Sequence, residues 1–208
     1  NRFGVSPGQR VAIFGNNADA HRTARDFAEA GVEVVAMIDS RAEAQPLGDY
    51  PLYTGAVVTG SRGRLGLKSI EIRQSDGSVK TIDCDVLGVS GGWNPSVHLT
   101  CHMNGRPIWD PALASFTPQP GAIPGLVAAG SAAGEMSTQG ALAQGQAEAL
   151  TLAKALGKRV KPSALPIADA TPYEITPFWD VGGTGRGWLD FQNDVTVKDI
   201  KQAVQENF

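Results

Sequence analysis

The sequence predicts an α/β protein made of Rossmann-like nucleotide-binding units, with an inserted antiparallel meander and an extended C-terminal arm. Three observations lead to this fold class. The N-terminal region has a strand–helix–strand pattern, a central region alternates apolar with polar residues, and two short apolar runs, Val86–Val89 and Leu126–Ala129, end in small residues.

Composition excludes several classes of function. A formal net charge of −3 over 208 residues gives no electrostatic basis for binding nucleic acid or an anionic membrane. No apolar run approaches the roughly 20 residues of a membrane span, and no secretory signal opens the chain. Two cysteines do not suffice for a disulfide framework or a metal site, so we expect a cytoplasmic protein.

The N-terminal region reads as a βαβ unit. Arg10–Phe14 predicts a strand, Ala18–Ala30 predicts a helix that stops at Gly31, and Val32–Ile38 predicts the second strand. A strand followed by a glycine turn and a helix is the arrangement that lets a helix N-terminus face a phosphate.

The dinucleotide fingerprint of this unit is degenerate. Gly15 holds the first glycine position, Asn17 replaces the second, and Ala20 fills the third. Asp39 is placed where an acid would bind the adenosine ribose, whereas Arg41 could equally face a 2′-phosphate. Two interpretations stay open at this point: a nucleotide site at Gly15 and Asp39, or a structural unit without a ligand.

The period of the pattern changes between Ala56 and Asp83. Ala56–Thr59, Leu67–Arg73 and Val79–Ile82 alternate apolar with polar residues, and a Ser-Asp-Gly turn separates the last two. This region therefore predicts the antiparallel meander.

The two apolar runs named at the outset predict parallel strands that end at a ligand. Val86–Val89 is followed by Ser-Gly-Gly, and Leu126–Ala129 by Gly-Ser-Ala-Ala-Gly, each before a helix-like segment. Glycines at such a strand end let a phosphate or ring approach the backbone. Two ordinary core strands with tight turns would give the same pattern, so spacing alone does not decide between them.

These residues carry a resemblance to a known family. The phrases DVLGVSGGWNPSVHL, Ile108-Trp109-Asp110 and WLDFQNDVT, together with the order of elements, resemble the alpha subunit of heterotetrameric sarcosine oxidase over nearly the whole chain. The more distant resemblance is to flavoprotein reductases of the two-domain FAD/NAD(P)-binding type. The first nucleotide motif of the family and its C-terminal folate-binding region are missing here, so the chain resembles a fragment.

The resemblance implies a division into three parts and a set of contacts. Residues 1–84 correspond to a second, inserted nucleotide-type domain with its meander, 85–157 to the later half of the first nucleotide-binding domain, and 158–208 to a linker and the start of a small helical module. The residues implied as nucleotide contacts are Gly91, Gly92, Asn94, Gly130, Ser131, Ala132 and Gly134, with Gly15 and Asp39 at the separate degenerate turn.

The family also implies an activity, cofactors and partners. Its complex oxidises sarcosine to glycine, with hydrogen peroxide and a one-carbon unit as the other products. The oxidation belongs to the flavin of the beta subunit, so no catalytic residue is assigned to this chain. Implied for the chain are NAD, contact with FMN at a subunit interface, and beta, gamma and delta subunits as partners. Folate belongs to the missing region.

Other features of the chain favour structural roles. His98 and His102 share a helical face, but no third ligand of the right type is nearby. Asn104–Pro124 contains five prolines and is expected to be extended and irregular. Asp190 and Gln192 stand where related subunits carry a Cys-x-Cys pattern, so no iron–sulfur cluster is expected.

The C-terminal third predicts two helices joined by a linker. Ser137–Leu156 predicts a long helix, and residues 158–187 predict an extended linker anchored by aromatic residues such as Tyr173. The last helix is expected to be capped by Thr196 with Asp199.

Two alternative functions stay open. One is a fragment of a flavin-dependent pyridine-nucleotide reductase, against which the lack of a CxxC pair counts. The other is a module whose nucleotide turns are vestigial and which only docks partner subunits.

Overall fold

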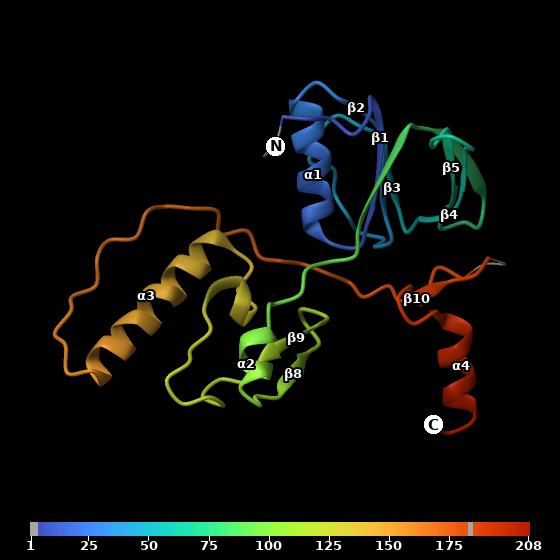
Figure 1. The fold of residues 1–208 in the computed structure, drawn as a ribbon. Helices are drawn as coiled ribbons and strands as arrows, with labels where there is room; N and C mark the ends of the chain where they lie inside the picture. The colour runs from blue at the N-terminus through green and yellow to red at the C-terminus, as the bar shows by residue number, and fades with distance from the viewer. Residues whose placement is uncertain (1–3, 183–184) are drawn as a thin grey trace.

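The computed structural model describes residues 4–182 and 185–208. Figure 1 shows a sheet-and-helix unit built from the N-terminal half and a second lobe that contains the longest helix. A C-terminal hairpin and helix lie beyond an extended arm, residues 158–182. Among the described residues, no helix is long and apolar enough to cross a membrane.

The N-terminal unit is organised by a four-stranded parallel sheet. Its strands, in spatial order, are β3 (Leu52–Thr54), β2 (Glu33–Asp39), β1 (Arg10–Gly15) and β7 (Val86–Ser90). β7 joins this sheet by pairing with β1, with Phe14 opposite Val89.

Helix α1 (Ala18–Glu29) covers one face of this sheet. Ala20 and Ala24 are fully buried against residues of β1 and β2 such as Val11 and Met37. Small side chains at these two positions let the helix approach the strands closely. The helix ends at Glu29 with Ala30 as its C-cap, and Gly31 follows with a left-handed φ of 79°, which suits a residue without Cβ.

The predicted meander covers the opposite face. Its strands are β4 (Val57–Arg62), β5 (Ser69–Arg73) and β6 (Val79–Asp83), joined in that order into an antiparallel sheet. Its inward side chains, Ile70, Ile72 and Ile82, form one core with residues of β1 and β2. The βαβ unit and the meander are thus confirmed, and the parallel sheet lies between α1 and the meander.

The second lobe contains a β-hairpin, which the proline content of the segment had led us not to expect. Its elements are α2 (His98–His102), β8 (Pro107–Asp110), β9 (Ser115–Pro118), the short 3₁₀ helix η1 (Gly130–Ala133) and α3 (Thr138–Ala155). The expectation of an irregular segment over Asn104–Pro124 was therefore wrong. Pro107 and Pro118 pair at the open end of the hairpin, a position that proline tolerates, and Trp109 packs edge-on against Phe116 with ring centroids 5.2 Å apart.

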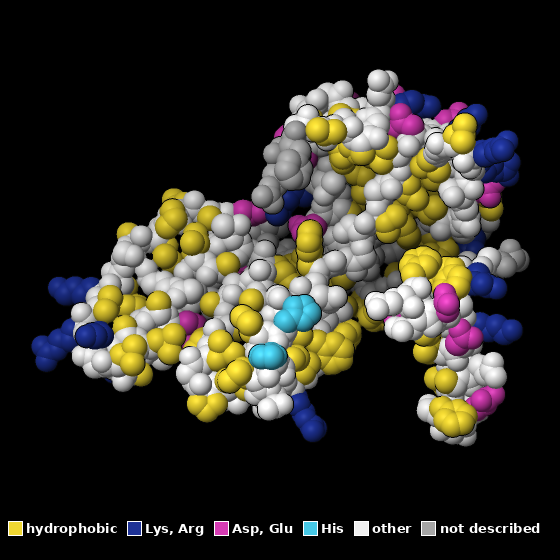
Figure 2. Space-filling view, in the orientation of Figure 1, with side chains coloured by type: hydrophobic (Ala, Val, Ile, Leu, Met, Phe, Trp, Pro, Cys, Tyr) yellow, Lys and Arg dark blue, Asp and Glu magenta, His cyan; other side chains and the backbone are white. Residues whose placement is uncertain are grey.

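The strand expected at Leu126–Ala129 was also wrong. This segment has no strand pairing in the part of the chain that the structure describes, and it leads directly into η1. A parallel strand needs a neighbour for its ladder of hydrogen bonds, and apolar character alone does not supply one. Helix α3 has no buried residue, and Figure 2 shows hydrophobic side chains spread over the surface of this lobe.

The C-terminal residues form a small separate module. β10 (Trp188–Asp190) and β11 (Val195–Thr196) pair antiparallel, and α4 (Val197–Gln205) follows. The predicted capping box is confirmed, since Thr196 and Asp199 bond reciprocally at the start of α4. Asp190 accepts hydrogen bonds from the backbone of Gln192 and Asn193, which gives it a structural role in the turn.

Candidate functional site

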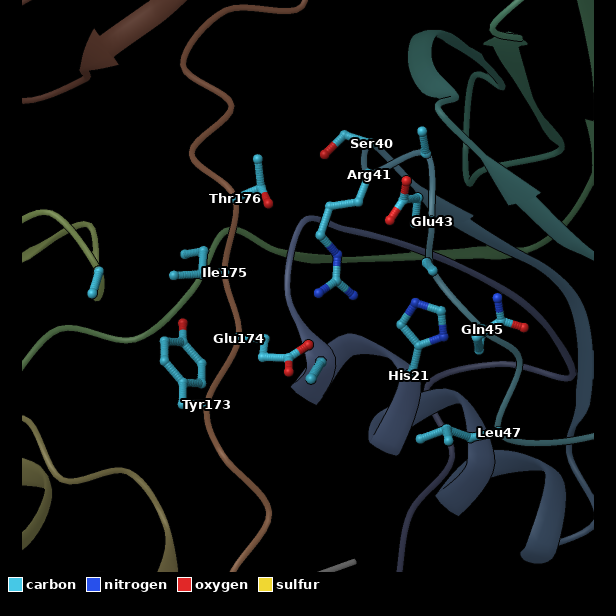
Figure 3. Close-up of a pocket in the computed structure, with 14 residues that line it drawn as sticks. His21, Ser40, Arg41, Glu43, Gln45, Leu47, Tyr173, Glu174, Ile175 and Thr176 are labelled. Carbon is cyan, nitrogen blue, oxygen red and sulfur yellow. The ribbon is translucent and has the colours of Figure 1, made fainter.

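The carboxyl ends of three parallel strands meet at one edge of the N-terminal sheet. Gly15 lies opposite Asp39 on one side and Ser90 on the other. In open α/β sheets this edge is where ligands bind. A cavity of about 930 Å³ lies here, and Figure 3 shows that its labelled lining comes from α1, from the loop after β2 and from the arm segment Tyr173–Thr176.

The turn after β1 is filled by the protein's own groups. A Cβ on Gly15 would collide with that of Ala20, so this glycine is required for close helix–strand packing. Asn17 is fully buried and caps α1, because its Oδ1 accepts from the Ala20 amide at 3.1 Å. Its Nδ2 donates to Ser90 O and Oγ at 3.1 and 3.0 Å. The side chain thus occupies the space that a glycine in the fingerprint would leave to a phosphate.

Asp39 is held by two basic side chains. His21 Nε2 lies 2.6 Å from its carboxylate, and Arg41 donates from Nη2 at 2.8 Å, from Nε and from its amide. Burial by itself would raise the pKa of Asp39, but the hydrogen bonds from His21 and Arg41 outweigh it and hold the pKa below its usual value.

The hydrogen bond to Asp39 also requires a proton on one ring nitrogen of His21. An ionised carboxylate can only accept, so Nε2 of His21 carries a proton. Nδ1 of the same ring is buried and has no hydrogen-bond partner in the described structure. Both side chains are almost completely buried, with 3% of His21 and none of Asp39 exposed. The acid at the ribose position is therefore already paired.

The Gly-Gly turn after β7 lies against the arm. A Cβ on Gly92, whose φ is 112°, would come within 2.8 Å of Tyr173 Oη and closer still to Ile175. The Tyr173 hydroxyl accepts a hydrogen bond from the Trp93 amide at 2.9 Å. Gly91 and Asn94 are exposed, and a Cβ on Gly91 would meet no atom within 4 Å. The backbone at Gly91 is thus open to approach.

The second small-residue turn lies in the other lobe. Gly130 is buried, has a left-handed φ of 63° and donates its amide to Gln144 of α3 at 2.8 Å. Gly134 closes η1 with a φ of 96°. Ser131 is exposed and Ala132 is half-buried. This turn precedes α3, whose N-terminus is capped by Ser137.

The predicted contacts fall into two groups. The sheet edge brings together Gly15, Asp39 and the Gly91–Gly92 turn, whereas the nearest neighbours of the Gly130–Gly134 turn lie on α3 and the β8–β9 hairpin. Sequence reasoning missed His21, which joins Asp39 across 18 positions of the chain. A histidine on the inner face of a helix beside an acid at a strand end is the signal that would have found it.

Over residues 4–182 and 185–208, no group of three His, Cys, Asp or Glu side chains could hold a metal ion. Both His98 and His102 are exposed on α2.

Comparison with known proteins identifies relatives along the whole chain. This chain is 37% identical to the sarcosine oxidase alpha subunit of Rhizobium meliloti over 213 aligned residues. The alignment covers 100% of this chain and 21% of the relative. The chain is homologous to part of the sarcosine oxidase alpha subunit. Alpha subunits from two Corynebacterium strains are 32% and 31% identical over 98% of the chain. The model of the sarcosine oxidase A3 domain matches residues 184–208. The chain spans about a fifth of the length of these relatives.

Solved structures share the fold. L-proline dehydrogenase from P. horikoshii has a TM-score of 0.60 at 14% identity, covering 100% of this chain and 39% of that one. Thioredoxin reductase from T. acidophilum has a TM-score of 0.59 at 17% identity, covering 72% of this chain and 53% of that one. The chain therefore shares the α/β fold of these two enzymes, in agreement with the fold class that the sequence predicts.

Proposed function

We propose that this chain is the nucleotide-binding portion of the alpha subunit of a sarcosine oxidase complex. The observation that supports this most strongly is the 37% identity to such a subunit along the whole chain. The complex would demethylate sarcosine oxidatively to glycine, with hydrogen peroxide and a one-carbon unit as products. In this proposal the chain contributes no catalytic residue.

Within this function, the chain would bind NAD. The contacts we propose are Gly91, Gly92, Asn94, Gly130, Ser131, Ala132 and Gly134. Gly15 and Asp39 lie at the separate degenerate turn. The open space above Gly91 and the exposure of Ser131 support backbone contact with a nucleotide. When bound, NAD would supply a pyrophosphate that small residues allow to approach the backbone.

The proposal includes an interface with other subunits. Exposed apolar side chains on α2 and the β8–β9 hairpin support this, among them Leu99 at 73% exposure and Phe116 at 52%. The beta, gamma and delta subunits would be the partners, with FMN at a subunit interface and folate in a region outside this chain. The division into residues 1–84, 85–157 and 158–208 remains a proposal as well.

Titration of the whole complex with NAD tests this function. Gly91→Ala adds a methyl group in open space, so it should leave the fold intact and weaken NAD binding about tenfold, or about 1.4 kcal/mol, if a nucleotide approaches there. Gly145→Ala, on α3 and also in open space, is the matched control and should not change the affinity. Equal NAD affinity in both variants would reject Gly91 as a contact, and no NAD affinity in the unaltered complex would reject the proposed function.

The contacts at the Gly15 turn favour a second role for the N-terminal unit, which is to dock the arm. At the Gly15 turn, Asn17 and the arm fill the phosphate position, and Asp39 is paired with His21 and Arg41. These contacts favour docking over nucleotide binding at this unit.

A further inference from the structure

The arm makes a strand-like contact with the turn where the fingerprint expects a phosphate. Asn17 and Ile175 form an antiparallel bridge. Its two hydrogen bonds run from the Ala18 amide to Glu174 O and from the Thr176 amide to Asn16 O, each at 3.0 Å. Ala18 is the first residue of α1, so a peptide carbonyl of the arm takes a donor that a phosphate oxygen would otherwise accept from.

Side chains reinforce this backbone contact. Asn16 Nδ2 donates to Thr176 O at 3.0 Å, so both the amide and the carbonyl of Thr176 are bonded to Asn16. Ile175 and the Tyr173 hydroxyl fill the space left by the missing side chain of Gly92. The arm therefore fits two turns of the sheet edge at once.

The arm is also anchored on both sides of this segment. On one side, Asp169 forms an ion pair with Arg22 of α1 at 2.7 Å. On the other side, Arg73 of β5 donates to Val181 O at 2.9 Å. Figure 1 shows the arm passing from the α3 lobe to the C-terminal module along this edge. Anchors at several points hold the segment in place without a helix or a longer strand.

The position expected for the adenosine ribose, at Asp39, is also occupied by side chains of the protein. Arg41 and His21 pair with Asp39, so a ribose would have to displace charged hydrogen bonds in order to reach the carboxylate. Figure 3 shows the Arg41 side chain and the arm residues Glu174 and Thr176 in the same pocket. Neither the phosphate position nor the ribose position is free.

We propose that the carboxyl edge of the N-terminal βαβ unit is the docking site of the arm segment Tyr173–Thr176, which occupies the phosphate position of that unit in place of a dinucleotide. The βαβ unit then serves to hold the arm in register with the sheet. NAD binding by the protein then uses the contacts proposed at Gly91–Asn94 and Gly130–Gly134, and not the turn at Gly15.

Hydrogen exchange in the whole complex, read at the Ala18 amide, tests the docking. Thr176→Pro removes the amide that donates to Asn16, whereas Thr176→Val keeps it and is the matched control. Because one of the two bridging hydrogen bonds is lost, Thr176→Pro should speed exchange at Ala18 about fivefold, and Thr176→Val should leave it unchanged. If Thr176→Pro does not fold, Tyr173→Phe removes the acceptor of the Trp93 amide and should speed exchange there.

The same measurement with saturating NAD tests the exclusion of nucleotide. Exchange over residues 15–20 and 39–41 should not change, and the arm should stay protected. Slower exchange at residues 15–20 with faster exchange at 173–176 would overturn the proposal, because NAD would then displace the arm. Unchanged exchange at Ala18 in Thr176→Pro would also overturn it. Failure of NAD to act anywhere would count against the proposed function alone, since the comparison of Thr176 variants needs no NAD.

Discussion

The pairing of Asp39 with His21 and Arg41 predicts that Asp39→Asn destabilises the N-terminal sheet. The amide would place a donor against a partner that itself donates, and it would leave the Arg41 guanidinium, 16% exposed, without its counter-charge. Removing one partner of a buried pair costs about 3–5 kcal/mol, and we expect a value near the lower end because Arg41 is partly exposed.

Hydrogen exchange in the complex measures this cost locally. The free energy of opening at β1 and β2 amides should fall by about 3 kcal/mol in Asp39→Asn. Asp76→Asn, in the exposed turn between β5 and β6, is the control and should leave those amides unchanged. A change below about 0.5 kcal/mol at β2 in Asp39→Asn would refute the assigned role of the carboxylate.

The pH dependence has a defined sign. Because the pKa of Asp39 is lower in the folded protein than its ordinary value of about 3.9, its stabilisation is fully present above that value. It is lost as the pH falls through the folded pKa. The difference between the native protein and Asp39→Asn should therefore be constant near neutral pH and shrink below about pH 4. A difference that shrinks already near neutral pH would contradict this account.

Three further predictions concern other parts of the chain. Asn17→Ala should lower the opening free energy of α1 by about 1–2 kcal/mol, because it removes the cap; no loss in hydrogen exchange would exclude that role. Gly145→Ala should stabilise α3 by up to about 1 kcal/mol, whereas Gly140→Ala should not, because its Cβ would collide with the Glu135 carboxylate; equal exchange in both variants would contradict this. Exposed Cys101 should be alkylated much faster than Cys84, whose burial raises its thiol pKa; equal rates by mass spectrometry would refute the burial.

The elements that local pattern encodes were predictable. The βαβ unit and the meander followed from periods of 3.6 and 2, and both elements appear near their expected bounds. The cap at Thr196 followed from short-range hydrogen-bonding chemistry. In each case the stabilising partner lies within a few residues or along one repeated face.

The wrong predictions concern elements whose formation depends on contacts with distant segments of the chain, which the local pattern does not specify. Leu126–Ala129 has the composition of a strand, but strand formation depends on a neighbour. The β8–β9 hairpin forms despite its prolines because Pro107 and Pro118 lie at its open end, where a backbone N–H donor is not needed. The docking of Tyr173–Thr176 on the Gly15 turn joins segments that are far apart in the chain, and an extended linker carries no periodicity that would reveal it. The aromatic anchor at Tyr173 was nevertheless predictable, and it is confirmed by its bond to Trp93.

The most direct test of the central claim is to identify the nucleotides that the purified complex releases when it is denatured. Mass spectrometry and absorbance of the released fraction would quantify NAD and FMN against the alpha subunit. The account predicts NAD in an amount equal to that of the alpha subunit. A complex that contains FMN but no NAD, and that takes up none on titration, would contradict the assignment of this chain as an NAD-binding portion.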